Sequence, residues 1–316
     1  MRVLVFAHMY PVPQHPEFGI FVQQQVESLR REGVEVDVLH VNVKESRLNY
    51  FWSFVPFLRH ALARRYDLVH AHYVFAGIVA RSQFRYPLVV THHGDEAFYG
   101  WQTPLCRVTS RLADKSIVVT EQIKNSIGPD DVAVIPCGVD FDVFRPKSKA
   151  QARAQLSLTP DRELVLFVGN YPERRKRFDL VQGAVERLRA GGHNVDLVVA
   201  YKQPYEKIPL YMNACDVLVL PSEREGSPQV VKEAMACDLP VVATEVGDVP
   251  EVLAGVEGCH LCRHDPSDIA EKLAMVLDRG GRTDGRERTR RFELGAVARR
   301  IIDVYQEVLD RKRHRQ

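Results

Sequence analysis

Several features that would place this chain in a specialised class are missing from it. No apolar run approaches the ~20 residues that cross a bilayer, so we expect no membrane-spanning helix. Residues 1–8, MRVLVFAH, are too few for a signal peptide and lack a small-residue cleavage region, so we expect a first strand there. The formal net charge of +2 gives no reason to expect a nucleic-acid partner. There is no low-complexity segment and no internal repeat beyond two α/β halves.

Cysteine is scarce as well. Six cysteines in a chain of this length, without a secretion signal, indicate reduced thiols in a cytosol. Cys259 and Cys262 have the spacing of half a zinc site, but the other four cysteines supply no second CxxC pair. The alternation around them favours a strand with both thiols half buried. The turn after the first expected strand also lacks the GxGxxG fingerprint of dinucleotide binding.

What the chain does contain is enough apolar sequence for two domains. Its 316 residues, 45% of them hydrophobic, fit two domains of about 150 residues each and argue against disorder. The charged, proline-flanked stretch 145–158 is a reasonable linker. We therefore expect an N-terminal domain at 1–145, a C-terminal domain at 146–292 and a terminal helical segment at 293–316.

Short apolar runs alternate with amphipathic stretches along both halves. Buried strands are expected at 2–7, 34–41, 67–72, 87–91, 115–120, 131–136, 164–169, 195–200, 216–221 and 258–262. Longer helices are expected at 20–33, 51–66, 265–279 and 292–312, and another begins near 178. Strands that alternate with helices predict parallel sheets, so the expected fold class is α/β with two doubly wound, Rossmann-like domains.

Polar side chains gather where three of these strands end. The strings are HHGDE at 92–96, NYPERRKR at 170–177 and EREGSPQ at 223–229. The carboxyl ends of parallel strands are where open α/β sheets bind ligands. Each string also has a plain interpretation: satisfied loop histidines, a solvated basic turn, and helix capping. Four consecutive basic residues at the carboxyl end of a strand are better explained by a diphosphate.

The third string combines a glycine, a helix start and two acids. Gly226 permits close backbone approach to a ligand, and Pro228 suits a first helical turn. Glu225 and Glu233 are eight positions apart, so the first lies at the loop mouth and the second about two turns into the helix. The free amides at the helix start suit a phosphate group.

The whole string 216–253 resembles the E-x7-E signature of retaining glycosyltransferases of family 4, which have the GT-B fold. The resemblance extends through Ala234, Gly247 and the PVVAT segment 240–244, and more weakly over nearly the whole chain. It implies two facing Rossmann-like domains with a cleft between them, and a terminal helix that crosses back to the first domain. It also implies sugar transfer from a nucleotide-diphosphate donor with retention of anomeric configuration.

The resemblance implies roles for individual residues. His93 corresponds to the histidine that contacts the donor sugar, and Lys176 to a lysine that neutralises the leaving diphosphate. Glu225 would hold sugar hydroxyls and Glu233 the ribose. The candidate catalytic residues are therefore His93, Lys176 and Glu225. The candidate substrate-binding residues are Gly19, Arg174, Arg175, Gly226, Ser227, Pro228, Gln229 and Glu233.

Two positions depart from the family pattern. Asn170 stands where the family has an arginine, and we expect Arg174 or Arg175 to replace its charge. Cys137 stands where asparagine is usual in the IPNGVD segment. No D-x-D string lies at a suitable place, and arginine and lysine can neutralise the phosphates. We therefore expect no metal and no cofactor beyond the donor, with a UDP-sugar favoured over a GDP-sugar.

The acceptor is expected to be a glycan or a polyprenyl-diphosphate-linked glycan of cell-envelope or extracellular polysaccharide synthesis. Residues 51–65 place six apolar side chains before Arg59, Arg64 and Arg65, a pattern that suits an anionic membrane surface. A helix whose aromatics belong to the domain core has the same pattern. The expected location is the cytosol, with peripheral contact to the inner face of the membrane.

Two other functions fit parts of the sequence. A nucleotide-sugar epimerase of related two-domain architecture would need acid/base carboxylates and would turn over the donor without an acceptor. A catalytically silent nucleotide-sugar-binding protein is consistent with the departures at Asn170 and Cys137.

Overall fold

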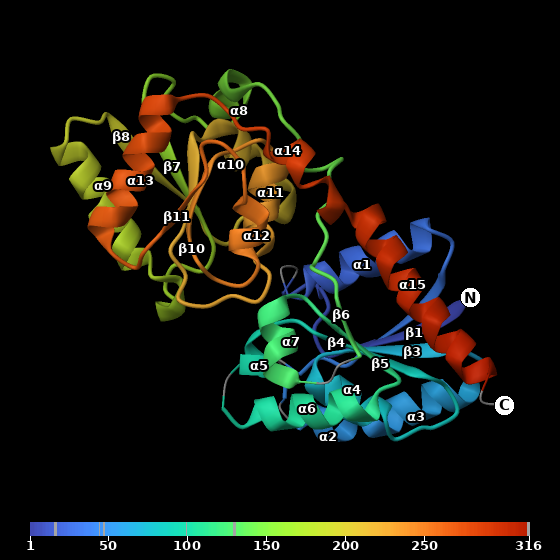
Figure 1. The fold of residues 1–316 in the computed structure, drawn as a ribbon. Coiled ribbons are helices and arrows are strands. Elements are labelled where there is room, and N and C mark those ends of the chain that lie inside the picture. Colours follow the sequence, from blue (N-terminus) through green and yellow to red (C-terminus); the bar gives the residue numbers. More distant parts are fainter. Residues whose placement is uncertain (16–17, 44, 47, 99, 129–130, 315–316) are drawn as a thin grey trace. The chain divides into compact units, whose positions relative to one another are not determined.

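The computed structural model describes residues 1–15, 18–43, 45–46, 48–98, 100–128 and 131–314. Two compact units divide the chain: unit 1 is Met1–Gly138 with Leu294–Gln316, and unit 2 is Val139–Glu293 (Figure 1). The sequence-based division after residue 145 lies seven residues beyond this boundary. Pro16, in the expected loop after the first strand, and Arg315, in the terminal basic run, lie outside the described residues.

Unit 1 is built on a sheet of six parallel strands. Their order across the sheet is β2-β1-β3-β4-β5-β6. Nearly all side chains of β1, β3 and β4 are buried, and most of them are apolar, as expected for strands covered on both faces. The strands are β1 Arg2–Ala7, β2 Glu35–His40, β3 Leu68–His72, β4 Leu88–His92, β5 Lys115–Val118 and β6 Val132–Val134.

Helices cover both faces of this sheet (Figure 1). α1 and α15 pack together on one face, where Val22, Val26, Ile301 and Tyr305 meet the side chains of β1 and β3. α3 and α4 cover the other face around Phe57. The helices of unit 1 are α1 Ile20–Arg31, α2 Asn49–Trp52, α3 Phe54–Ala63, α4 Val74–Ala80, α5 Asp95–Phe98, α6 Gln102–Leu112, α7 Glu121–Ile127 and α15 Leu294–Arg313.

Unit 2 repeats the plan with five parallel strands. Their order is β11-β10-β9-β7-β8. The strands are β7 Glu163–Val168, β8 Val195–Ala200, β9 Val217–Leu220, β10 Val241–Thr244 and β11 His260–Cys262. The prediction of two parallel α/β domains is confirmed by these sheets.

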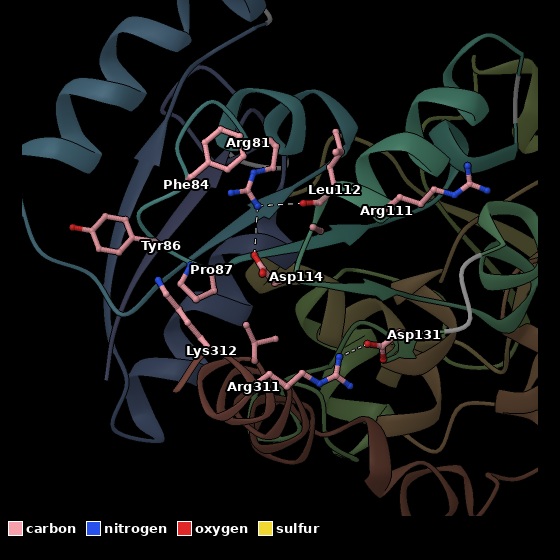
Figure 2. A pocket seen from close by; sticks show the side chains of 12 residues that line it. Arg81, Phe84, Tyr86, Pro87, Arg111, Leu112, Asp114, Asp131, Arg311 and Lys312 are labelled. Carbon is pink, nitrogen blue, oxygen red and sulfur yellow. Dashed lines mark hydrogen bonds and ion pairs between the residues drawn. The ribbon is translucent and has the colours of Figure 1, made fainter. Parts of the chain in front are cut away.

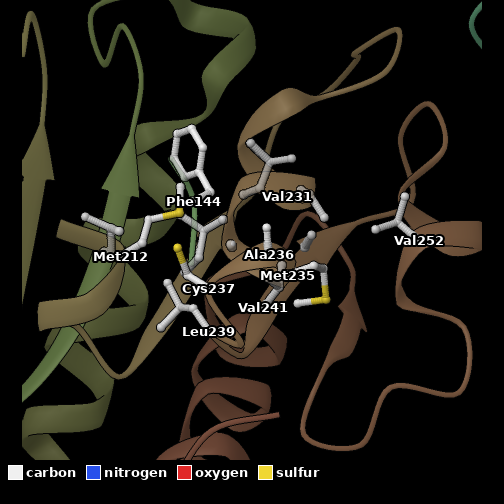
Figure 3. Packing of buried hydrophobic residues seen from close by; sticks show 14 of the residues in the cluster. Phe144, Met212, Val231, Met235, Ala236, Cys237, Leu239, Val241 and Val252 are labelled. Atoms are coloured by element: carbon white, nitrogen blue, oxygen red, sulfur yellow. The ribbon is translucent and has the colours of Figure 1, made fainter. Parts of the chain in front are cut away.

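The helices of unit 2 also form two layers. α9 and α13 cover one face of the sheet. α10, α11 and α12 cover the other, around Phe144, Met212 and Met235 (Figure 3). The helices of unit 2 are α8 Lys149–Gln155, α9 Phe178–Ala190, α10 Ile208–Ala214, α11 Gln229–Ala236, α12 Val249–Leu253, α13 Pro266–Arg279 and α14 Gly285–Arg288, with 3-10 turns η1 Arg174–Lys176, η2 Tyr205–Lys207 and η3 Arg290–Phe292.

The single helix expected at 51–66 was wrong in detail, because the segment forms two helices, α2 and α3. Pro56 explains the break: it has no N–H to donate to the carbonyl of Trp52 four residues earlier. Phe57 is fully buried, whereas Phe51 and Trp52 are 76% and 68% exposed. The core interpretation therefore holds for Phe57 but not for Phe51 and Trp52, and the membrane interpretation stays a prediction.

Two expectations from the missing sequence features can be compared with the structure. No helix within the described ranges is long and apolar enough to cross a bilayer. The six cysteines, all of them in the described ranges, form no disulfide. Cys259 lies just before strand β11 and is half-buried as expected, whereas Cys262, the last residue of β11, is buried.

Candidate functional site

In unit 2, the carboxyl ends of β7 and β9 bring the basic turn and Glu225 together. The Lys176 Nζ lies 2.5 Å from Glu225 Oε1, and Arg175 Nη1 lies 3.2 Å from Glu225 Oε2. A backbone hydrogen bond of 2.8 Å from Glu223 N to Arg175 O joins the two loops. Residues about fifty positions apart in sequence therefore form one charged cluster at the edge of the sheet that binds ligands in α/β folds.

The cluster distinguishes the two arginines that the sequence left open. Arg175 contacts Glu225 and also Glu173, at 2.6 Å. Arg174 is exposed, and its side chain has no hydrogen bond or ion pair to any residue in the described ranges. Arg175 is thus the arginine held beside Lys176, while Arg174 is the one with an unengaged guanidinium. Asn170 is exposed at the start of the turn.

Glu225 is a carboxylate by environment. Burial alone would raise its pKa, but the charges and hydrogen bonds of Lys176 and Arg175 outweigh burial, so its pKa lies below the ordinary value. Without a ligand, the two cations expected to meet a diphosphate are therefore neutralised by a side chain of the same site.

The loop that carries Glu225 is packed tightly against a second glycine turn. Gly247 has φ +55°, and a Cβ atom there would lie only 1.9 Å from the carbonyl oxygen of Gly226. Pro228 caps α11 without a side-chain hydrogen bond, so the first amides of the helix are not capped by that side chain. The Oε1 atom of Gln229, at the helix start, is buried without a hydrogen-bond partner in the described part of the chain. An unsatisfied acceptor in this position suits a donor group on a ligand.

A buried ion pair beneath this loop was missed from the sequence. Lys232, with a fully buried side chain, lies 2.6 Å from Asp248, which is 1% exposed. Ser227 donates a 2.9 Å hydrogen bond to the same carboxylate, and Lys232 also contacts the Ser227 hydroxyl. The available signal was a lysine within the apolar pattern of α11, but only the fold brings Asp248 to it. The trio fixes Ser227, and with it the loop from Glu225 to Pro228.

Glu233 occupies a different environment from Glu225, eight residues earlier. Its side chain is buried, and desolvation raises its pKa to about 7, with a hydrogen bond from Tyr205 and the charge of Lys232 acting in the opposite direction. Tyr205 comes from η2, so the segment before α10 reaches the E-x7-E helix. A hydroxyl donor beside Glu233 would lower its pKa and so favour the charged carboxylate.

In unit 1, His93 follows β4 and is buried in a ring of neighbours. Its backbone N–H donates a 2.8 Å hydrogen bond to Glu96 Oε1. Its Nε2 lies 2.9 Å from His72 Nδ1, and its Nδ1 lies 3.8 Å from the Cys137 sulfur. Burial, then the neighbouring histidines, hold the pKa of His93 well below the usual range, so its ring is neutral at neutral pH.

Cys137, the unusual residue in the IPCGVD segment, therefore has an identifiable place. It contacts the ring nitrogen of His93 that His72 leaves available. His92, the alternative to His93, is fully buried at the end of β4, and both its ring nitrogens lack a partner among the described residues. The structure thus gives His93 a defined ring orientation and gives His92 none through hydrogen bonding.

Gly19 forms a close backbone contact in unit 1. It has φ +78°, and a Cβ atom there would lie 2.5 Å from the carbonyl carbon of Met9. Phe21, at the start of α1, packs against His93 with 4.7 Å between ring centroids. The start of α1 and the residue after β4 are therefore neighbours.

Comparison with known proteins agrees with this geometry. Residues 2–143 match the model of Glycosyltransferase Family 4, and residues 197–279 match that of Glycosyl transferases group 1. A D-inositol 3-phosphate glycosyltransferase of Nocardiopsis dassonvillei is 32% identical over 269 residues, which are 67% of this chain and 62% of the relative. A second relative with that name, from Catenulispora acidiphila, is 29% identical over 76% of this chain and 70% of its own length.

Solved structures share the fold along nearly the whole chain. Sucrose-phosphate synthase from Thermosynechococcus elongatus gives a TM-score of 0.81 at 22% identity, covering 98% of this chain and 100% of that one. HepE from Anabaena, in complex with UDP and glucose, gives 0.71 at 16% identity, covering 96% and 99%. The solved structures, each less than 25% identical, show that the chain shares the GT-B fold. The two family models together match more than half of the chain, so the chain belongs to the family 4 (group 1) glycosyltransferases.

Proposed function

We propose that the protein transfers a sugar from a nucleoside-diphosphate donor to a hydroxyl of an acceptor, with retention at the anomeric carbon. The observation that carries the proposal is the cluster of Lys176, Arg175 and Glu225 at the carboxyl ends of β7 and β9. It provides two cations suited to a diphosphate and one carboxylate suited to sugar hydroxyls. Family membership supports the same reaction class.

Donor binding involves an exchange of partners in this cluster. The donor diphosphate takes Lys176 and Arg175 from Glu225, and the released carboxylate accepts hydrogen bonds from the sugar. Amides at the start of α11 add to the neutralisation of the phosphates. Glu233 accepts hydrogen bonds from the ribose hydroxyls. His93, as a neutral ring, orients the donor sugar.

In the chemical step, the bond between the anomeric carbon and the phosphate oxygen breaks as the acceptor oxygen bonds to that carbon. The acceptor attacks the face that the nucleotide leaves, and its proton passes to the departing phosphate. Negative charge grows on the diphosphate during this step, so Lys176 and Arg175 stabilise the transition state more than the bound donor. We assign no metal to this step.

A UDP-sugar is the proposed donor, and the solved HepE complex with UDP and glucose supports this choice by likeness of fold. The proposed acceptor is a glycan or a polyprenyl-diphosphate-linked glycan. The similarity to D-inositol 3-phosphate glycosyltransferases adds a soluble phosphorylated polyol as a second candidate. Exposed Phe51 and Trp52 on α2, together with exposed Arg59 on α3, support peripheral contact of α2 and α3 with an anionic leaflet on the cytosolic side.

A panel of UDP- and GDP-sugars, followed by release of the nucleoside diphosphate, tests the proposal. We expect acceptor-dependent release with one donor, using lipid-linked glycans and inositol phosphate as separate acceptors. Conversion of the donor without any acceptor would instead support an epimerase. Donor binding with no turnover across the panel would support a silent binding protein.

A further inference from the structure

A polar cavity lies in unit 1, at the opposite edge of the sheet from His93. Its volume is about 580 Å³. Pro87, Asp114 and Asp131 line it, and each comes just before the strand β4, β5 or β6. The cavity is therefore at the amino ends of these strands, whereas His93 follows the carboxyl end of β4. It belongs to neither the E-x7-E region nor the histidine cluster.

Positive charge predominates in the cavity wall. Four cationic and two acidic side chains line it. Figure 2 shows Arg81 with Phe84 on one wall and Arg311 with Lys312 on the opposite wall. Asp131 is already engaged by Arg311 and by Lys115, and the hydrogen bond from Arg311 is the main reason that its pKa is lowered. Its charge is therefore largely compensated.

The guanidinium of Arg81 is held in place mainly by neutral groups. It donates to the carbonyls of Leu112, at 3.2 Å, and Gln83, at 2.9 Å, and lies over the ring of Phe84 at 4.5 Å. Asp114 is 3.5 Å away and also accepts a 2.8 Å hydrogen bond from the backbone N–H of Leu88. The Arg81 Nε is buried without a partner among the described residues. Arg81 is thus oriented, yet only weakly neutralised.

Two further cations have even less compensation. Arg111 is exposed at the end of α6, and its side chain makes no hydrogen bond or ion pair within the described ranges. Lys312, on α15, donates a 2.7 Å hydrogen bond to the carbonyl of Arg85 and has no acidic partner there. By contrast, Arg311 is saturated by Asp131 and Glu307. The unneutralised charge is therefore on Arg81, Arg111 and Lys312, which come from three separate segments.

We propose that this cavity binds a phosphate ester, with Arg81, Arg111 and Lys312 as its cationic ligands. Oriented guanidinium and ammonium groups match phosphate oxygens, which accept several charge-assisted hydrogen bonds. Phe84 and Leu112, which are 81% and 54% exposed, form an apolar rim beside these charges. The rim favours an ester that carries an uncharged part over bare inorganic phosphate. An anionic phospholipid headgroup and a soluble sugar or glycerol phosphate share this chemistry.

Binding of sn-glycerol 1-phosphate, measured by calorimetry at low salt, tests the site independently of sugar transfer. The test variant Arg111→Gln/Lys312→Gln removes two ligands and leaves Arg81 with its structural hydrogen bonds. The control Arg107→Gln/Arg313→Gln removes the same charge from the same two helices, α6 and α15, at positions outside the cavity. We expect saturable binding that is at least tenfold weaker in the test variant and unchanged in the control.

A second arm uses vesicles of phosphatidylcholine with and without phosphatidylglycerol. If binding to phosphatidylglycerol vesicles also falls tenfold in the test variant alone, the source is a lipid headgroup. If only glycerol phosphate binding falls, the source is a soluble ester. If the wild type binds neither ligand, or the test variant and the control behave alike, the proposal is overturned. None of these outcomes depends on donor turnover, so failure of the proposed transferase activity would be seen separately.

Discussion

The two units solve the problem of burying polar groups in opposite ways. Unit 1 buries neutral histidines, with His70, His72, His92 and His93 all inside it. Unit 2 buries charges as compensated clusters, with Lys232 on Asp248 and Lys176 with Arg175 on Glu225. Their surfaces differ as well: of the fourteen exposed large apolar side chains among the described residues, eleven are in unit 1.

The difference suits the proposed division of ligands between the two units. A diphosphate needs fixed cations, and a fixed cation needs a local counter-charge when no ligand is bound, as Glu225 provides for Lys176. Neutral rings and an apolar surface suit sugar hydroxyls and lipid. The comparison therefore agrees with the proposal that unit 2 holds the donor diphosphate, while unit 1 supplies His93 for the donor sugar and a surface for the acceptor.

The largest expected difference is in the response to acid. Burial lowers the pKa of His72 to about 3 and the pKa of His92 to about 4. Burial, with a contribution from His40, also lowers the pKa of His8 to about 4. Unfolded histidine titrates near 6.5, so the stability that these neutral rings confer is present above pH 6.5 and is lost as the pH falls toward their folded values. Between pH 6.5 and 5, each of these histidines lowers the free energy of unfolding by about 2 kcal/mol. Hydrogen exchange of the full chain at pH 7.5 and 5, corrected for intrinsic rates, should show unit 1 opening more readily at pH 5.

Unit 2 should respond to the same change with the opposite sign at Glu233. Its pKa of about 7 lies above the unfolded value, so its contribution is fully present below pH 4.5 and is lost as the pH rises through 7. Peptides of unit 2 should therefore keep or gain protection at pH 5. Equal loss of protection in both units would contradict the contrast.

The next effect is on the stability of unit 2 after loss of its buried cation. Lys232→Met leaves Asp248 as an uncompensated buried charge and should cost about 3–5 kcal/mol. The surface variant Lys272→Met, which breaks an ion pair with Glu271, should cost less than about 1 kcal/mol. Protection of unit 2 peptides in hydrogen exchange measures both.

If Lys232→Met does not fold, Lys232→Met/Asp248→Leu replaces the ion pair with apolar groups and should recover a folded protein. Recovery with a weaker donor affinity would show that the pair positions the Ser227 loop. If Lys232→Met were as stable as the wild type, Lys232 would not have the stabilising role assigned to it.

A smaller effect, about 1–3 kcal/mol, should separate the two glutamates of the signature. Glu233→Gln should weaken binding of free UDP, whereas Glu225→Gln should mainly weaken binding of the UDP-sugar. Because Glu233 has a pKa of about 7, UDP binding near pH 6.5 should release protons in the wild type and not in Glu233→Gln. Calorimetry in buffers of different ionisation enthalpy measures this release. Equal losses for both ligands in both variants would end the division of roles.

The smallest effect concerns the surface of unit 1. Arg59/Arg64/Arg65→Ala should reduce co-sedimentation with anionic vesicles at low salt, by about 1 kcal/mol per side chain at most. Arg64 already pairs with Asp37 at 3.0 Å, so its share should be the least. A triple variant of unit 2, Arg187/Arg263/Arg279→Ala, loses the same charge and should bind like the wild type.

If the wild type did not sediment with the anionic vesicles at low salt, the proposed membrane contact of α2 and α3 would be contradicted. Equal binding by both triple variants would contradict it as well. A soluble acceptor would then be the better proposal.

Much of the fold could be read from the sequence because apolar runs of four to six residues define its buried strands. β1 and β8 begin and end where the pattern predicts. The break between α2 and α3 was missed because the apolar pattern continues on both sides of Pro56, and such a pattern does not show that proline lacks the backbone N–H.

The site was predictable only where neighbouring residues form it. The basic turn and Glu225 were identified from local strings, but their ion pairs join residues about fifty positions apart. Lys232 with Asp248, and Cys137 with His93, depend on which loops the strand order brings together. No spacing rule connects such pairs, so these contacts required the structure.

The central claim is that Lys176 stabilises the leaving diphosphate, and the kcat of Lys176→Ala tests it most directly. The negative charge that Lys176 opposes is larger in the transition state than in the bound donor. The activation free energy should therefore rise by about 2–4 kcal/mol, so that kcat for release of nucleoside diphosphate at saturating donor falls roughly 30- to 1000-fold. The control Lys272→Ala, a lysine of the same unit that also pairs with a glutamate, should retain wild-type kcat. An unchanged kcat in Lys176→Ala, with only the KM for the donor raised, would contradict the account.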